Sequence, residues 1–458
     1  MKSAADRFDV IVIGAGVAGL AAARALVEHG LDVVVLEARE RIGGRVLTVR
    51  DAGFPDPIEL GAEFVHGTAP ELVELAPKAG LRIVDISGHR RRSRGRQLRL
   101  ADDSWDRINR VMKRLDPRRT PDRSFADFLA EEPGGTSQAQ DRAYTRRYVE
   151  GFHAADPARI GERALADGGS PGDDLAERRI GRIIEGYDRV VQWLAAPLGD
   201  RVRLSTVVSD VRWKRHAADV SCHTLSGSSR ESLSARAVIV TVPIGVLSAQ
   251  PVDVGAIEFE PDPVAKRELI ARIAMGDVAR VTILLTERFW ADDAYVKRVV
   301  VGKPRELHTL SFLETSDEDP FPTWWTHYPS TTPLLVGWQG GPAARAMLVR
   351  GRSAVEGEAL KALGRRFHLS RATVDRLVNG MWFHDWTHDP FARGAYSYQA
   401  VGGADAPAAM ARPISGTLFF AGEATDVDGR TGTVHGAIAT GERAANQVVR
   451  SLTARRRS

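Results

Sequence analysis

The order of apolar and polar positions near the N-terminus predicts two short strands joined by a helix. Val10–Ile13 is an apolar, β-branched run that is typical of a buried parallel strand, and Asp32–Leu36 is a second such run. Between them, the Ala-rich stretch from about Val17 to His29 favours a helix that ends at Gly30, a residue common just after a helix C-terminus. The chain therefore opens with a strand, a helix and a strand, which is the unit of an α/β fold.

Later segments extend this pattern. Arg201–Trp213 alternates apolar and polar residues as a strand does, and Ala237–Val242 is a buried apolar run ended by Pro243. Thr417–Thr425 predicts a strand that runs into a loop. From about Pro70 to Arg179 the pattern predicts helices with polar and Pro/Gly-rich interruptions, and nothing in that segment indicates its chemistry.

Length and charge narrow the class of protein. A chain of 458 residues predicts two domains, and 43% hydrophobic with 27% charged residues is ordinary for a globular enzyme. The net charge of +4 gives no general field that would attract nucleic acid. The basic residues cluster in His89–Arg96 and in Arg455–Arg457, without interleaved aromatic residues, so both runs are interpreted as solvated surface and no nucleic-acid partner is expected.

Cysteine content and hydropathy indicate where the protein works. Cys222 is the single cysteine, which excludes an internal disulfide and a thiolate metal cluster, and no metal site is expected. The first eight residues are too short and polar for a signal peptide, and the longest apolar stretch, Ala235–Ala249, contains Pro243 and is too short to span a membrane. A cytoplasmic protein without a membrane partner is therefore expected.

The loop after the first strand carries the first candidate chemistry. Gly14, Gly16 and Gly19 have the G-x-G-x-x-G spacing, in which the glycines permit a tight turn, close approach of a pyrophosphate and close helix packing. Glu37 lies at the end of the second predicted strand, where a carboxylate can accept hydrogen bonds from both ribose hydroxyls of an adenosine and would repel a 2′-phosphate. This context predicts dinucleotide binding.

A second glycine pair decides between NAD and FAD. Arg41–Arg45 reads Arg-Ile-Gly-Gly-Arg, so two glycines again permit close backbone approach and two guanidinium groups can neutralise a pyrophosphate. Nicotinamide-dependent enzymes of this type need no second phosphate clamp at this point. FAD is therefore the predicted cofactor.

These motifs, in this order, resemble those of the flavoprotein amine oxidase superfamily. The resemblance continues in Glu59–Gly67, which is similar to the "G-A-x-W-x-H-G" segment of polyamine oxidases, in Arg182–Tyr187, in Met275–Ile283, and in Trp386–Tyr398. The Thr-Val-His-Gly-Ala sequence within Thr431–Ala437 is closest to the polyamine oxidase and lysine-specific histone demethylase branch. The resemblance covers nearly the whole chain outside about residues 80–180.

The resemblance implies an α/β fold in which a Rossmann-type, GR2-like FAD-binding domain is interleaved with an α+β substrate-binding domain. The FAD-binding domain would comprise residues 1–80, 180–255 and 385–458, and the substrate-binding domain residues 81–179 and 256–384. Ala395 stands where mitochondrial monoamine oxidases have the cysteine that bonds covalently to the flavin, so the FAD is expected to be non-covalent. The residues implied to contact FAD are Gly14, Ala15, Gly16, Gly19, Glu37, Ala38, Arg39, Gly43, Gly44, Arg45, Gly61, Ala62, Glu63, Val208, Trp386, Gly422, Glu423, Thr433 and Val434.

Four residues are the candidates for the catalytic site. By resemblance, His66 faces the substrate channel, Tyr396 is the first residue of an aromatic cage, and Thr433 replaces the second cage aromatic and leaves room for a longer or secondary amine. Arg280 stands where the family has a lysine that holds a water against flavin N5; we expect it to hold such a water or to bind a substrate carboxylate. Three alternatives stay open, because a loop histidine is often a solvated turn residue, a strand valine such as Val208 often only packs in the core, and the tryptophans of Phe289–Trp290 and Thr323–Trp325 suit a core or a channel wall.

The function implied by the resemblance is oxidation of an amine C–N bond. A hydride passes from the amine to flavin N5, the resulting imine hydrolyses, and O₂ is the expected acceptor, giving H₂O₂. Since an amine with a pKa of about 10.4 is neutral in only about one molecule in a thousand at pH 7, an apolar cage would favour the reactive form. The alternatives are a flavin dehydrogenase or desaturase that acts on a C–C bond or uses another acceptor, and a catalytically idle flavin-binding protein; the partner is a small amine and the assembly a monomer or a homodimer.

Overall fold

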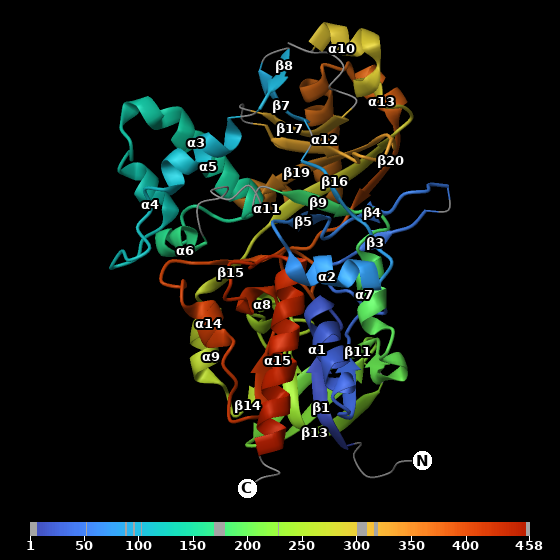
Figure 1. Cartoon of the computed structure of the whole chain (residues 1–458), viewed down its shortest axis with the longest axis vertical. Coiled ribbons are helices and arrows are strands. Elements are labelled where there is room, and N and C mark those ends of the chain that lie inside the picture. Colours follow the sequence, from blue (N-terminus) through green and yellow to red (C-terminus); the bar gives the residue numbers. More distant parts are fainter. Residues whose placement is uncertain are drawn as a thin grey trace.

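The computed structural model describes residues 7–454 except 52, 88, 95–96, 102, 169–178, 228, 300–308 and 316–318. Two large sheets lie one above the other, with a group of helices at the side of the upper sheet (Figure 1). The first sheet has the strand order β10-β2-β1-β13-β12-β11-β14, with β22 also paired to β13. Its strands are β1 (Arg7–Ile13), β2 (Val33–Leu36), β10 (Val202–Arg203), β11 (Thr206–Lys214), β12 (Ala217–Thr224), β13 (Arg230–Val240), β14 (Glu258–Glu260) and β22 (Leu418–Phe420).

The predicted strand–helix–strand unit is confirmed in the first sheet. β1 pairs in parallel with both β2 and β13, and α1 (Val17–Glu28) connects β1 to β2. The alanines of α1 allow α15 (Val434–Ala454) to lie beside it, as Figure 1 shows, and Gly441 of α15 comes so close that an added Cβ would lie 2.3 Å from the Ala18 carbonyl oxygen. The N-terminal and C-terminal segments of the chain therefore pack together on one face of this sheet.

The second sheet has the order β20-β16-β19-β18-β17-β7-β8 and lies in the upper half of Figure 1. Helices α10 (Asp293–Val299), α11 (Gly341–Leu348), α12 (Arg352–Phe367) and α13 (Arg371–Leu377) accompany it. Its strands are β7 (His89–Arg94), β8 (Gln97–Leu100), β16 (Val278–Leu285), β17 (Leu310–Thr315), β18 (Thr323–Thr326), β19 (Leu334–Gly340) and β20 (Val378–Phe383).

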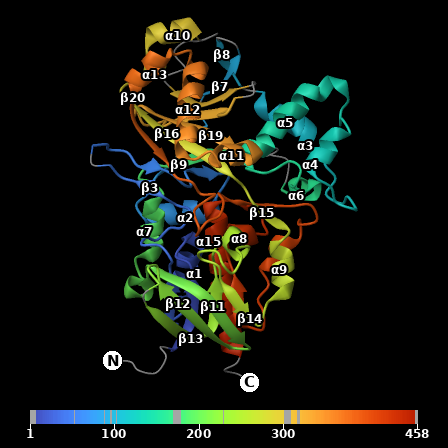
Figure 2. The same ribbon diagram turned by 180° about the vertical axis from the view of Figure 1, so that it is seen from behind.

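The remaining elements connect the two sheets or lie at their sides. Figure 2 shows β11, β12 and β13 of the first sheet from behind, with α9 and β14 at its edge. Three smaller sheets pair β3 with β4, β15 with β21, and β9 with both β5 and β6. These elements are β3 (Thr48–Val49), β4 (Ile58–Glu59), β5 (Phe64–His66), α2 (Pro70–Lys78), β6 (Ile83–Asp85), α3 (Ser104–Met112), α4 (Phe125–Ala130), α5 (Ala139–Phe152), α6 (Glu162–Asp167), β9 (Ile180–Ile183), α7 (Asp188–Ala195), α8 (Ile244–Leu247), α9 (Val264–Ile270), β15 (Ile273–Met275), β21 (Ser397–Gln399) and α14 (Ala406–Met410).

The structure corrects the sequence interpretation of residues 83–100. This stretch was expected to be helical, but it forms β6, β7 and β8, and the basic run is not solvated surface. β7 pairs in parallel with β17, and its alternate residues Arg91 and Ser93 are buried, at 2% and 1% exposure. Gly95, Arg96 and Arg455–Arg457 lie outside the described residues.

One edge strand of the first sheet does not follow the expected domain boundary. β14 pairs in parallel with β11, so residues 258–260 belong to the first sheet although the segment that starts at 256 was assigned to the substrate-binding domain.

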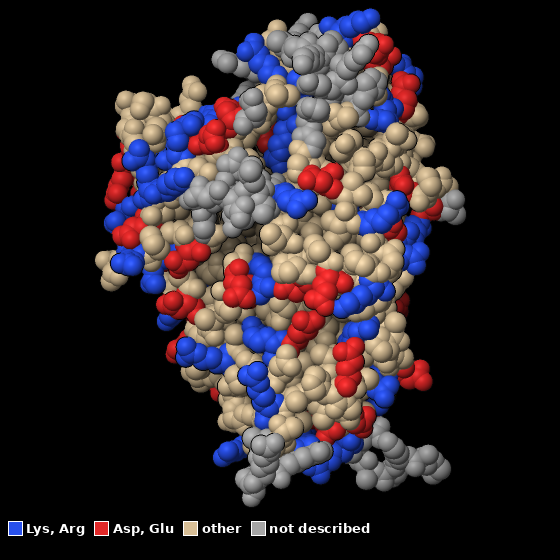
Figure 3. Space-filling model, in the orientation of Figure 1, with Lys and Arg blue, Asp and Glu red and all other residues tan. Residues whose placement is uncertain are grey.

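None of the helices in the described part of the chain is both long and apolar enough to cross a membrane. On the face shown in Figure 3, acidic and basic side chains are interspersed.

Candidate active site

A cavity of about 910 Å³ lies between the two sheets. It starts at the carboxyl ends of β1 and β2, passes the first residues of α1 and α15, and reaches β16 and one face of α5. A dinucleotide usually binds where the carboxyl ends of parallel strands lie next to a helix N-terminus. Seventeen of the sequence-predicted cofactor residues line this cavity: Gly14, Gly16, Glu37, Ala38, Arg39, Gly43, Gly44, Arg45, Gly61, Ala62, Glu63, Val208, Trp386, Gly422, Glu423, Thr433 and Val434.

The two glycine motifs form one cradle. Gly14 has φ +102° and turns the chain out of β1, while Gly16 and Gly43 are bridged by their backbones. A Cβ added at Gly44 would lie 3.2 Å from Gly16 Cα, so the two loops touch and leave no room for side chains between them. Gly19 does not line the cavity; an added Cβ would lie 2.0 Å from the Gly14 carbonyl oxygen, so this glycine permits the close approach of α1 to the turn.

Glu37 connects this cradle to the end of β2. Its side chain is buried and its two carboxylate oxygens accept hydrogen bonds from the backbone N–H groups of Ala15, at 2.8 Å, and Arg39, at 2.9 Å. Ala15 thus takes part through its backbone and does not itself line the cavity. An acidic group fixed here, beside a glycine cradle and at the N-terminus of α1, fits the adenosine and pyrophosphate of FAD.

Arg41 does not act as a second phosphate clamp in this structure. It does not line the cavity, and its guanidinium donates to the carbonyl oxygens of Ile42, Gly44 and Val46 within its own loop. The pattern of two flanking arginines therefore has two separate uses, because Arg41 shapes the glycine loop and only Arg45 faces the cavity.

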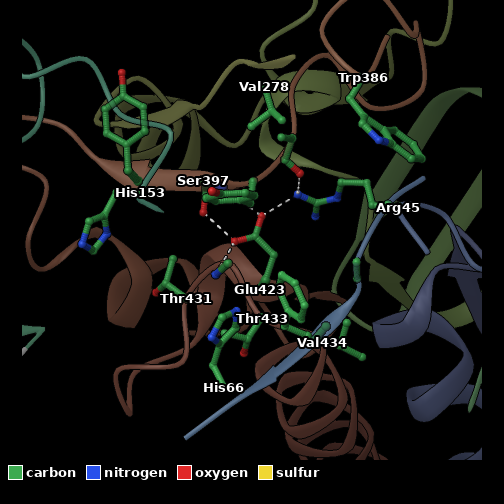
Figure 4. Close-up of a pocket in the computed structure, with 18 of the residues that line it drawn as sticks. Arg45, His66, His153, Val278, Trp386, Ser397, Glu423, Thr431, Thr433 and Val434 are labelled. Atoms are coloured by element: carbon green, nitrogen blue, oxygen red, sulfur yellow. Dashed lines mark hydrogen bonds and ion pairs between the residues drawn. The ribbon is translucent and has the colours of Figure 1, made fainter. Parts of the chain in front are cut away.

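Glu423 links the cofactor cradle to the C-terminal segments, as the dashed lines in Figure 4 show. Its Oε1 accepts from Nη1 of Arg45 at 2.8 Å, and its Oε2 accepts from the Ser397 hydroxyl at 2.7 Å and from the Gly432 backbone N–H at 3.0 Å. Nη1 of Arg45 also donates to the Ala395 carbonyl oxygen at 3.0 Å. This single carboxylate thus joins Arg45, which is 378 residues away in the sequence, to two C-terminal segments that lie 26 and 9 residues from it.

Two helix N-termini face the cavity. The first residues of α1 and of α15 line it, and no side chain caps the N-terminus of α1. Thr433 holds the start of α15, because its hydroxyl donates to the Arg430 carbonyl oxygen at 2.6 Å and accepts from the Gly436 N–H at 3.0 Å. Free N–H groups and the positive helix dipole at such a position suit the negative charge of a reduced flavin ring.

Arg280 lies in a buried cluster with Glu63. Nη1 of Arg280 donates to the Gly61 carbonyl oxygen and Nη2 to Glu63 Oε2, both at 2.6 Å, while Arg182 donates to Glu63 Oε1 at 2.5 Å. The indole N–H of Trp325 donates a hydrogen bond to Glu63 Oε2 at 3.0 Å. Burial alone would raise the pKa of Glu63, but the two arginine charges outweigh it and hold that pKa below its usual value. Burial likewise lowers the pKa of Arg280.

The other end of the cavity is walled by aromatic rings. The ring of His66 contacts Phe152 edge to face, with centroids 5.4 Å apart, and Tyr148 stacks on Phe152 at 5.1 Å. His153 packs against both Tyr148 and Phe152. Burial lowers the pKa of His66 and of His153 to about 4, so both imidazoles are neutral at pH 7.

Tyr396 lies between this wall and the start of α15. Its hydroxyl donates to the Phe152 carbonyl oxygen at 2.6 Å, and its ring covers Gly432, where an added Cβ would lie 3.2 Å from Tyr396 Cδ2. Burial raises the pKa of Tyr396, so its phenol stays protonated and donates. The structure thus brings His66, Tyr396, Thr433 and Arg280, the four predicted catalytic residues, to the same cavity.

Sequence reasoning missed several residues of this cavity. Tyr144, Tyr148 and Phe152 of α5 recur every four residues and point into it, a periodicity that is visible in the segment for which no chemistry was predicted. Arg182, which shares Glu63 with Arg280, comes from a strand whose sequence carries no signal for such a role. Lys266 does not line the cavity, because its ammonium group donates to the carbonyl oxygens of Ala409, Met410 and Arg412.

Comparison with known proteins agrees with this geometry. Polyamine oxidase 4 of Oryza sativa subsp. japonica is 29% identical over 96% of this chain and 88% of its own length. Among solved structures, cyclohexylamine oxidase from Brevibacterium oxydans IH-35A has a TM-score of 0.78 at 23% identity, covering 97% of this chain and 99% of its own. A putrescine oxidase bound to putrescine has a TM-score of 0.78 at 20% identity with the same coverage, and these two likenesses establish a shared mixed α/β fold.

Residues 17–449 match the family described as flavin containing amine oxidoreductase. The match confirms the resemblance drawn from the sequence motifs and confirms the flavin cofactor. The residues of the cavity described above fit FAD in particular, since the glycine cradle and Glu37 suit its adenosine diphosphate half. The chain belongs to the family of flavin-containing amine oxidoreductases.

Proposed function

We propose that this FAD-dependent enzyme oxidises the C–N bond of an amine that enters the aromatic-walled end of the cavity, with O₂ as the final acceptor. The observation that carries this proposal is the continuity of one cavity, because the glycine cradle and the aromatic wall open into the same space. The putrescine oxidase and cyclohexylamine oxidase that share the fold act on amines, as their names state.

The residues of the aromatic wall would select the reactive, neutral form of the amine. His66 and His153 have a pKa of about 4 and carry no charge at pH 7, and Tyr396 keeps its proton. A wall of neutral rings disfavours an ammonium ion and so raises the fraction of free amine. When bound, FAD would supply the redox chemistry as the hydride acceptor for the carbon beside the nitrogen, and the imine product would hydrolyse in water.

The cofactor is held without a thioether bond. The chain has one cysteine, Cys222, which is buried in β12 and does not line the cavity. Ala395 has no group that could bond to the flavin. FAD is therefore non-covalent, held by the glycine cradle, by Glu37 and by the start of α15.

The detailed assignments are part of this proposal. The parallel sheet around β1 supports a Rossmann-type, GR2-like FAD-binding domain of residues 1–80, 180–255 and 385–458, to which β14 adds an edge strand. Residues 81–179 and 256–384 would then form most of the substrate-binding domain. A cytoplasmic enzyme, monomeric or homodimeric, that binds no nucleic acid remains the prediction.

Anaerobic mixing of the yellow holoenzyme with primary amines, secondary amines and polyamines tests the proposal. We expect the flavin absorbance to bleach with at least one amine class and to return when air is admitted. Absence of bleaching with every amine would contradict amine oxidation and favour a C–C dehydrogenase or an idle protein. Bleaching that air does not reverse would instead identify a dehydrogenase with another acceptor, the second candidate, which the pairing of Arg280 with Glu63 favours because the family lysine is missing there.

A further inference from the structure

The charged residues of the cavity are unevenly compensated. Every acidic side chain that lines it lies within 4 Å of an arginine: Glu37 of Arg39, Glu63 of Arg280, Glu314 of Arg90, Glu423 of Arg45, and Asp428 of Arg430. Among the described lining residues, no carboxylate is therefore left to bind the second ammonium group of a diamine.

Arg147, in contrast to these acidic residues, lines the cavity without a paired charge among the described residues. It lines the cavity from α5, and within the described part of the chain its guanidinium has neither a hydrogen-bond nor an ion-pair partner. The ring centroid of Tyr144 lies 5.9 Å from the guanidinium carbon of Arg147. Burial lowers the pKa of Arg147, because its charge is partly withdrawn from water, and the nearby charges of Tyr144 and Glu150 offset this effect only in part.

Arg90 adds positive charge on the facing strand. Its guanidinium lies 4.7 Å from the centroid of the Phe312 ring and 3.5 Å from Glu314 Oε1, which is a long contact. Glu314 is shared, since its other oxygen accepts from the hydroxyl of Tyr144 at 2.5 Å and lies 3.9 Å from Arg92. One carboxylate thus faces two arginines here, and Arg147 adds a third.

The position of Arg147 relative to Tyr396 gives the spacing of a ligand. Tyr144, Arg147, Tyr148, Gly151 and Phe152 follow one face of α5 and all line the cavity. Tyr396 is hydrogen-bonded to Phe152, five residues from Arg147, which is roughly 7 Å along the helix axis. A ligand with a nitrogen at the Tyr396 end and an anion at Arg147 would lie along the aromatic face between them.

We infer that the substrate is an amine that carries a carboxylate at its other end, and that Arg147, with Arg90, binds this carboxylate. This inference rests on the proposed amine oxidation. A guanidinium beside an aromatic face presents a planar pair of donors that matches a carboxylate. A single substrate carboxylate would balance the charge of Arg147, which has no ion-pair partner among the described residues. A diamine would instead place an ammonium group against two arginines and be repelled.

The test compares three amines of equal length with the holoenzyme: ε-aminocaproate, hexylamine and hexamethylenediamine. We expect kcat/KM to fall in that order, by roughly tenfold or more from the first to the last, and the preference to shrink at high salt. In Arg147→Gln, KM for ε-aminocaproate should rise about 10- to 100-fold, because a charge-assisted hydrogen bond to its carboxylate is lost. Its kcat, and the kinetics of hexylamine, should stay unchanged. Arg147→Glu should reverse the order and favour the diamine.

Arg146→Gln is the matched control, because Arg146 is the next residue of α5 but is exposed and paired with Glu150. It should leave all three substrates unaffected. Equal or better oxidation of hexamethylenediamine, or an equal loss for hexylamine in Arg147→Gln, would overturn the inference.

A calorimetric titration of the holoenzyme with caproate separates this inference from the proposed function. Caproate binding that is lost in Arg147→Gln and kept in Arg146→Gln supports the carboxylate subsite even if no amine bleaches the flavin. Caproate binding that is absent, or the same in both variants, overturns it even if hexylamine is oxidised.

Discussion

Arg280 and Glu63 form a buried ion pair in which Nη2 lies 2.6 Å from Oε2, and the sequence resemblance implies a lysine in the position of this arginine. The guanidinium also reaches the Gly61 carbonyl oxygen, so it bridges two points of the segment that passes the flavin. A lysine would present all its donors from one compact ammonium group, whereas the guanidinium reaches the two points with separate nitrogens. The substitution therefore changes what the side chain can offer to a water beside the flavin.

Arg280→Lys should speed the reaction of the reduced enzyme with O₂. We expect roughly a tenfold gain, about 1.4 kcal/mol of barrier, because a lysine frees an ammonium donor for a water at the flavin. Stopped-flow mixing of the photoreduced protein with air-saturated buffer measures the rate. Arg182→Lys is the control, since Arg182 shares Glu63 but does not line the cavity; an unchanged rate in Arg280→Lys would show that the arginine does not limit reoxidation.

Glu63→Gln should destabilise the protein strongly. It leaves Arg280 and Arg182 buried without their common anion, and the loss of one partner from a buried pair typically costs about 3–5 kcal/mol. Urea unfolding of the apoprotein, followed by tryptophan fluorescence, measures the change in the free energy of unfolding. Glu74→Gln, at an exposed ion pair on α2, should show no measurable change; a similar loss in both variants would argue against the buried cluster as the cause.

The pH dependence of kcat/KM should follow the substrate and not the histidines. His66 and His153 have a pKa of about 4, so both are already neutral through the range from about pH 5 to 8. Over this range kcat/KM should rise with pH as more amine becomes neutral, towards the amine pKa of about 10. Steady-state kinetics of hexylamine give this profile, and a break near pH 6.5 that disappears in His66→Gln would contradict the neutral wall.

Glu423→Gln should weaken FAD binding. The amide loses the ion pair with Arg45 and retains at most part of the contacts with Ser397 and Gly432, so we expect the Kd of FAD to rise about tenfold. Ultrafiltration of holoenzyme and measurement of released flavin give the Kd. Glu28→Gln, at the exposed end of α1, serves as the control. An unchanged Kd would mean that Arg45 binds the cofactor without help from Glu423.

The sequence predicts those parts of the fold whose conformation is determined by residues close together in the chain. The β1–α1–β2 unit and the glycine turn at Gly14 follow from steric rules that act over a few residues, and their positions agree with prediction to within three residues. The basic strand β7 could not be predicted in the same way. Its arginines are placed by Tyr144 and Glu314, which lie far along the chain, and a polar sequence without alternation gives no strand signal.

The same distinction holds within the site. The segments that carry His66, Arg280, Tyr396 and Thr433 match family motifs and could be located, whereas their roles depend on partners that no motif contains. Thr433 caps α15 as well as facing the cavity, and Arg280 is engaged by Glu63. Arg147 belongs to α5, a segment in which no family motif was identified. Only the folded arrangement shows that it has no ion-pair partner among the described residues.

The packing of α15 beside α1 has a consequence for biosynthesis. The glycine turn at Gly14 precedes Glu423, Gly432 and the start of α15 by hundreds of residues, so it is synthesised well before them. A nascent chain can therefore form the β1–α1–β2 unit early, but the cavity has all its walls only once α15 has been made. We expect a truncated product that ends before α15 to retain the glycine turn and to bind flavin poorly.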